Sequence, residues 1–391
     1  MKRLGRWWRF WVELFSQRES ASGLALFRIA LGLVILYSLL SIRIAGLVDV
    51  FWIDVGHGGY APLGEGNWLL AWLGGPTPSV VHWVHAVAVL GALAMVVGIG
   101  GRWVILLTLQ TYNALVTINL NVSGGYDLMI TNALWLLFFS DCMATYSLSC
   151  RRKTGSFTQN VLISAWPRYL IVFQILVIYT STGLYKLSAD WTPAGGYSAL
   201  FHVFQDPTWR RFDMDFTASV YPLTQLGTAM VWHWECSAWL MLLVYYFRYT
   251  RDRDGRLRRW FNRWDLRLPY AAIGLSMHIG ILFTLNVGPF SWIAMSYYIL
   301  FFRPEEVERV MARLVARLTG RPPTAAGDRD PSSGEDAAGP PGGGSDASAE
   351  KPDDSRPAKP RKQRSKAGKT SGQSQKSRKK GARKSGKKRR R

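Results

Sequence analysis

Long apolar runs with few charges recur through the first 300 residues of this 391-residue chain. A helix needs about 20 mostly apolar residues to cross the roughly 30 Å hydrocarbon layer of a membrane. Runs of about this length cover residues 23–42, 79–99, 103–120, 126–146, 161–185, 221–247 and 268–302. The last run is long enough for two crossings, and we expect it to break at Gly288-Pro289 because proline blocks the preceding helical turn. The sequence therefore predicts an all-α fold, a polytopic transmembrane helix bundle of about eight spans, and excludes an ordinary soluble enzyme.

The basic residues concentrate at the end of the chain. The formal net charge is +22, and residues 321–391 contribute +13 of it without a single Val, Ile, Leu, Met, Phe, Trp or Tyr. Such a segment has no apolar side chains whose burial would offset the entropy lost on folding. We therefore expect residues 311–391 to form a disordered basic tail after a membrane domain at 21–310.

Arg and Lys in the connections predict the orientation, because cationic residues are retained on the cytoplasmic side of a membrane. With the N-terminus inside, the predicted outer connections over 46–78 and 121–125 carry no Arg or Lys, and that over 187–220 carries two. The predicted inner connection over 248–267 carries eight arginines. Residues 1–20, which include the RWWRFW stretch, suit an interfacial segment. This pattern predicts both termini in the cytoplasm and the end of the fifth span, near residue 186, outside.

Ionisable side chains at membrane depth are costly and therefore call for an explanation. Arg28 is expected to extend its side chain to the inner surface. Lys186 closes the fifth span, where a desolvated lysine can lose its proton and act as a base; alternatively it only anchors the helix, pairing with Asp190 four residues on. Glu235 and His278 are expected either to form a polar pair that carries a proton or to hold helices together.

The motifs of common soluble enzymes are absent from the sequence. His82 and His85 share one helix face and would supply two metal ligands, but no third ligand is evident, so no metal site is predicted. The glycines at 98–101 follow no strand and precede no Lys-Ser/Thr, which argues against a phosphate-binding loop.

Four blocks give the chain a resemblance to the HTTM (horizontally transferred transmembrane) domain family, which includes the vitamin K-dependent gamma-carboxylase. The likeness spans roughly residues 20–310, and the hexad Lys186–Trp191 (KLSADW) is its most specific part. The blocks are LFRIALG at 26–32, LGALAMVVG at 90–98 followed by Arg102, GLYKLSADW at 183–191, and His278 with LFTLNVGPFS at 282–291.

The resemblance implies that Lys186 occupies the position of the carboxylase's catalytic base, which deprotonates reduced vitamin K so that oxygen can add. It makes a reduced quinone the candidate cofactor near Lys186, and we expect Tyr185 and Trp191 to contact a bound cofactor. The chain departs from the carboxylases at the start of the fourth span, where SGGYD at 123–127 lacks their Asn-His pair. It also ends in a basic tail instead of a large extracytoplasmic domain. Both departures argue against protein carboxylation.

Two functions from different classes follow. The first is a membrane enzyme that performs base chemistry on a quinone or lipid, with Lys186 as base, Asp190 setting its charge state, and Glu235 and His278 in support. The second is a noncatalytic membrane protein that binds a lipid or serves as a scaffold for a partner. The tail is expected to contact anionic lipids, with nucleic acid as the alternative. The resemblance associates this pattern with bacterial members, which predicts a bacterial cell (inner) membrane location.

Overall fold

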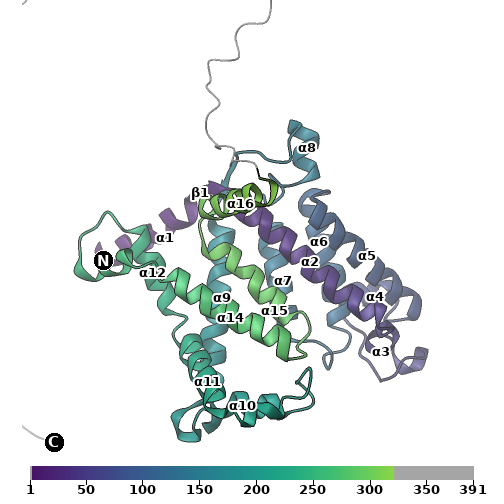
Figure 1. The fold of residues 1–391 in the computed structure, drawn as a ribbon. Helices are drawn as coiled ribbons and strands as arrows, with labels where there is room; N and C mark the ends of the chain where they lie inside the picture. The colour runs from purple at the N-terminus through teal and green to yellow at the C-terminus, as the bar shows by residue number, and fades with distance from the viewer. Residues whose placement is uncertain (1, 321–391) are drawn as a thin grey trace, which may run out of the picture. The chain divides into compact units, whose positions relative to one another are not determined.

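Helices dominate the computed structural model, which describes residues 2–320 (Figure 1). The first part contains α1 (Lys2–Ser16), β1 (Arg18–Ser20), α2 (Ser22–Ile44), α3 (Val48–Trp52), η1 (Val55–His57), α4 (Trp68–Leu73), α5 (Pro78–Val97), α6 (Gly101–Val116), α7 (Gly125–Phe138) and α8 (Leu148–Thr154). The second part contains β2 (Leu162–Ser164), α9 (Trp166–Tyr185), η2 (Ala189–Trp191), η3 (Pro193–Gly195), α10 (Ala199–Gln205), η4 (Asp215–Ala218), α11 (Tyr221–Cys236), α12 (Leu240–Tyr249), α13 (Arg256–Arg263), α14 (Arg267–Thr284), α15 (Phe290–Tyr297), η5 (Tyr298–Phe301) and α16 (Pro304–Thr319). The predicted helical fold is confirmed, with one exception, an antiparallel pair formed by β1 and β2.

Three helices, α2, α5 and α9, are long and apolar enough to cross a membrane. A fourth candidate is the pair α13 and α14, whose axes differ by 49°. The other predicted spans also contain helices, but these are shorter, with 16 residues in α6, 14 in α7 and 16 in α11. The protein is thus a helical membrane protein with three to four candidate spans.

Two of the predicted apolar segments are interrupted in the structure. The break expected near Gly288 is confirmed, since α14 ends at Thr284, α15 begins at Phe290, and Gly288 adopts a left-handed φ of 58°. The apolar run over 221–247, which we expected to form one span, consists of two helices, α11 and α12. Between α11 and α12 the chain forms i to i+3 hydrogen bonds over residues 235–242, which is the bonding pattern of a 3₁₀ turn.

The helices pack in two groups that α15 joins. In the first group α2 packs on α5, α5 on α6, and α6 on α7. In the second, α9 packs against α11, and α14 packs against α15. Helix α15 also contacts α2, α7 and α9 in the middle of the bundle (Figure 1).

Two buried arginines, one in α2 and one in α9, connect their helices to other segments at the end of the bundle that contains β1 and α16. Arg28 is fully buried instead of reaching the surface, because Nη1 donates to the Cys142 carbonyl at 3.0 Å and Nη2 to the Tyr146 carbonyl at 2.6 Å. Arg168 in α9 forms a buried ion pair with Glu19 of β1, with Nε 2.7 Å from Oε1. The pairing of β1 with β2, which directly precedes α9, holds Glu19 beside this arginine. These contacts fix one end of the bundle, while α10 and α11 lie at the other end (Figure 1).

The predicted tail boundary differs from the structure. Helix α16 continues to Thr319, so residues 311–319, which we expected in the tail, belong to a helix. Residues 321–391, the remainder of the predicted tail, lie outside the described residues.

Candidate active site

Lys186 follows the last residue of α9 and places its ammonium group against α11. Its Nζ pairs with Oε2 of Glu235 and lies 4.7 Å from the centroid of the Trp191 ring. Both charged side chains are largely covered, with 19% of Lys186 and 9% of Glu235 exposed. Removing two charges from water is costly, and the direct pairing of the ammonium group with the carboxylate offsets part of that cost. The geometry therefore supplies Lys186 with an adjacent proton acceptor.

Gly183 allows this approach of α9 to α11. A Cβ atom on Gly183 would lie 2.7 Å from the backbone nitrogen of Cys236 and 2.9 Å from the Cβ of Glu235. Because real Cβ atoms do not come this close to backbone, any larger residue would push the two helices apart. The missing side chain thus brings Glu235 within reach of Lys186.

Asp190 does not pair with Lys186, contrary to the expectation from their spacing. Its carboxylate accepts hydrogen bonds from the hydroxyls of Ser188 at 2.8 Å and Ser198 at 2.9 Å, and it lies 4.0 Å from His202. These hydrogen bonds, first that of Ser188 and then that of Ser198, lower the pKa of Asp190 below its usual value. The reason for the difference is that α9 ends before Lys186, so helical i to i+4 spacing no longer relates the two residues.

His278 of α14 belongs to a buried chain of hydroxyl groups. Its Nε2 lies 2.7 Å from the hydroxyl of Tyr179 in α9, and the hydroxyl of Tyr298 in η5 donates to that of Tyr179 at 3.2 Å. His278 is fully buried, and its Nδ1 has no hydrogen-bond partner within residues 2–320. Three helical elements therefore converge on one polar cluster inside an apolar core.

Glu235 and His278 make different contacts, so the direct pair that we expected does not form. Trp234 precedes Glu235 and packs its ring edge-on against Tyr179, with centroids 4.6 Å apart. Its indole nitrogen donates to the Tyr270 carbonyl at 3.0 Å. Trp234 thus links the Lys186–Glu235 pair to the tyrosine–histidine cluster through packing.

The two residues predicted to contact a cofactor differ in their surroundings. Trp191 lies against the ammonium group of Lys186, as described above. The Tyr185 side chain is 80% exposed and makes no polar contact with Lys186.

Tyr179, Gly183 and Trp234 were not predicted as site residues. Tyr179, Gly183 and Lys186 follow one another at i, i+4 and i+7, which places them on one face of a helix. This spacing was the available signal in the sequence. No such spacing in the sequence identifies Trp234 as a site residue, because its role depends on how α11 packs against α9.

The position where the carboxylases carry Asn-His forms the capped start of α7. Asp127 is buried and accepts hydrogen bonds from the Tyr112 hydroxyl at 2.6 Å, the Ser123 hydroxyl at 2.9 Å and the Gly124 amide at 2.8 Å. With both of its oxygens occupied, this carboxylate is suited to holding α6 and α7 together.

His82 and His85 also have separate partners. His82 lies between Arg43 and Asp49, at 3.1 Å from each, whereas Nε2 of His85 lies 3.1 Å from the Leu39 carbonyl. Within the part of the chain that the structure describes, no three His, Cys, Asp or Glu side chains are grouped to hold a metal ion.

Comparisons with known proteins add one finding to this geometry. The sequence profile of the HTTM domain matches residues 16–305, which include both helix groups and every residue of the cluster. Comparisons with curated proteins and with solved structures gave no match.

Proposed function

The chain belongs to the HTTM domain family, and we propose that it is a membrane enzyme in which Lys186 acts as a base on a membrane quinone or lipid. The observation that supports this most strongly is the covered contact between Lys186 and Glu235, bordered by the Trp191 ring. An ionisable pair placed at the end of an apolar helix is a candidate for a functional site.

The proposed proton transfer begins with the ion pair. The Lys186 ammonium passes its proton to the Glu235 carboxylate, which leaves a neutral amine beside a carboxylic acid. The amine then takes the proton of an acidic hydroxyl on the substrate and becomes an ammonium group again. The substrate oxyanion is stabilised by this cation in a site of low dielectric constant.

The substrate we propose is a reduced quinone, which the resemblance to the carboxylase suggests. A hydroquinone hydroxyl is acidic enough to give its proton to a lysine amine, and an aromatic ring can stack on Trp191. Protein carboxylation is not part of the proposal, because the Asn-His pair is replaced and Asp127 is fully engaged in capping α7.

His278, Tyr179 and Tyr298 are proposed as positioning residues. They hold α9, α14 and η5 together behind the Lys186–Glu235 pair, and Trp234 packs between the two groups. Asp190 is proposed to fix the η2 turn, and so the Trp191 ring, through its bonds to Ser188 and Ser198.

The test of this proposal measures epoxide formation by full-length protein in vesicles that contain a reduced quinone and oxygen. We expect Lys186→Ala to lower the initial rate by at least about 100-fold, the usual effect of removing a general base. Lys186→Arg retains the cation and the pairing with Glu235 but holds its proton, so it should fold normally and be equally inactive. Lys153→Ala is the control, because Lys153 is exposed on α8, at the end of the bundle opposite α11 (Figure 1). Equal rates in Lys186→Ala and the unchanged protein would contradict the proposal.

A noncatalytic membrane protein is the second candidate, and the same ion pair favours it. A buried Lys186–Glu235 contact between α9 and α11 also explains these residues if they only join helices. In that case Lys186→Ala should lower the melting temperature. Neither the unchanged protein nor the Lys186→Ala variant should then show turnover with any quinone.

We also propose eight crossings of the bacterial cell (inner) membrane with both termini in the cytoplasm. This topology places Lys186 on the face of that membrane opposite the cytoplasm. This topology rests on the distribution of Arg and Lys, with eight arginines over 248–267 and none over 46–78. For the tail we propose contact with anionic lipids, and nucleic acid as the alternative. Either contact should weaken steeply as salt increases, because 19 basic residues lie within 351–391.

A further inference from the structure

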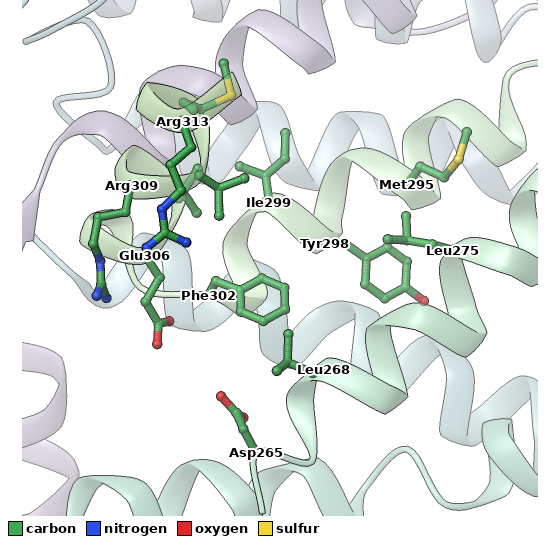
Figure 2. Close-up of a pocket in the computed structure, with 13 residues that line it drawn as sticks. Asp265, Leu268, Leu275, Met295, Tyr298, Ile299, Phe302, Glu306, Arg309 and Arg313 are labelled. Atoms are coloured by element: carbon green, nitrogen blue, oxygen red, sulfur yellow. The ribbon is translucent and has the colours of Figure 1, made fainter. Parts of the chain in front are cut away.

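A groove of about 550 Å³ runs between α14, η5 and α16, and it shares Tyr298 with the tyrosine–histidine cluster but does not include Lys186 or Glu235. Its volume falls in the range of about 300–1,000 Å³ that is usual for small-molecule sites. Figure 2 shows Leu275, Met295 and Tyr298 at one end of the groove, and Arg309 and Arg313 at the other. The groove is thus apolar at one end and cationic at the other.

The apolar end is built by two helical segments. Met295 in α15, Ile299 in η5 and Phe302 directly after η5 all line the groove. Leu268 and Leu275 project from α14 at i and i+7 across from them. These side chains form walls suited to a hydrocarbon chain and supply no polar group along its length.

The carboxylates in the groove are already neutralised. Arg267 is buried and binds both acids: Nη2 lies 2.7 Å from Asp265 Oδ2 and 2.9 Å from Glu306 Oε1. Arg248 adds a second cation, 3.4 Å from Asp265 and 3.9 Å from Glu306. The acids therefore leave no net negative charge to repel an anion.

The cations at the groove mouth remain available. Arg309 and Arg313 are exposed, and within residues 2–320 neither forms an ion pair. Arg309 makes one hydrogen bond, from Nε to the Glu305 carbonyl at 3.2 Å, which leaves its terminal nitrogens free to donate. Guanidinium groups of this kind bind phosphate oxygens in a bidentate manner.

Helix α16 has the character of a helix at a membrane surface. Val310, Met311 and Leu314 are all more than 40% exposed, and they alternate with arginines along the helix. Such a helix lies with its apolar side chains in the membrane and its cations near the headgroups. The groove beneath it would then open at headgroup level and extend toward the hydrocarbon.

We propose that this groove binds one anionic phospholipid, with an acyl chain between α14 and the α15–η5 segment and the phosphate at Arg309 and Arg313. The charge complementarity at the mouth selects the anionic headgroup, and the apolar walls select a lipid over a soluble phosphate. The site does not depend on Lys186, so it stands whether or not the proposed base chemistry is correct.

The experiment uses full-length protein in phosphatidylcholine vesicles with a phosphatidylglycerol probe that carries a photoreactive group on one acyl chain. High salt, about 0.5 M, screens the attraction of the basic tail for the membrane. We expect cross-links over 268–275 and 295–302, mapped by mass spectrometry. The double variant Arg309→Gln/Arg313→Gln should reduce them about tenfold or more. Leu275→Trp should reduce them similarly by filling the groove.

The matched controls lie on the same helices. Arg317→Gln removes a cation one turn beyond Arg313, and Ile279→Trp adds bulk one turn beyond Leu275 on an exposed position. Both should label normally. Equal labelling by a phosphatidylcholine probe, or equal losses in Arg317→Gln and the double variant, would overturn the proposal. So would competition by glycerol phosphate, which would mark a free-anion site, or the absence of cross-links to these segments.

Discussion

At Gly183 the missing side chain lets the backbone of α9 lie against Glu235 and Cys236. The consequence reaches beyond packing, because the same approach sets the distance between the ammonium group of Lys186 and its acid partner. A change of one methyl group therefore tests whether the site depends on this contact.

We expect Gly183→Ala to destabilise the protein by about 1–3 kcal/mol, the usual cost of overpacking a close contact. Gly280→Ala is the matched control, because α14 has nothing within 4 Å of the position where its Cβ would be. Thermal unfolding in detergent, followed by circular dichroism, gives the comparison. If both alanine variants melt at the same temperature, the close approach of α9 to α11 is not a real constraint.

Helix α16 is attached to the start of α14 by the ion pair between Glu306 and Arg267. Partial burial is the largest single effect and raises the pKa of this carboxyl. The hydrogen bonds from Arg267 and the Arg303 backbone, together with the charges of Arg267 and Arg248, outweigh it and lower the pKa below the usual 4.5. A group whose pKa is lower in the folded state stabilises that state above its unfolded pKa and loses this effect as the pH falls. Asp265 behaves in the same way, since burial raises its pKa but the hydrogen bonds and charge of Arg267 and the charge of Arg248 together lower it by more.

We therefore expect the melting temperature to fall as the pH drops from about 5 to 3, across the unfolded pKa values of these two acids. Glu306→Gln should be less stable than the unchanged protein at pH 6 and should show a shallower decline toward pH 3. Glu305→Gln provides the control, because Glu305 is exposed and its side chain forms no ion pair with the residues described. An identical acid profile for both variants would rule out a contribution from the Arg267–Glu306 contact.

For the whole molecule, the proposed topology is accessible to chemical labelling. With the three native cysteines replaced by alanine, Thr208→Cys in the 187–220 connection should react in intact cells with a maleimide that cannot cross membranes. Asp252→Cys in the arginine-rich connection should react only after the cells are opened. Both positions are exposed in the structure, so accessibility within the protein does not bias the comparison. Labelling of Asp252→Cys in intact cells would invert the proposed orientation.

The helical character, the break near Gly288 and the family could be predicted from the sequence, because each depends on residues close together in the chain. Apolar length determines which segments can cross a membrane, and proline in the interior of a helix interrupts it. The KLSADW hexad, which is also a local sequence signal, identified Lys186 as a candidate site residue.

The partners of these residues were decided only by the tertiary structure. Lys186 binds Glu235, 49 positions away, instead of nearby Asp190, and Arg168 binds Glu19 at a separation of 149. Such contacts depend on where a helix ends, how closely a glycine lets two helices approach and which loop supplies carbonyl groups. The same holds for the groove, whose walls come from α14 and η5 and whose cations come from α16. Local sequence determined which segments form helices, whereas packing determined which charges meet, because ion pairs form between side chains that only the folded chain brings together.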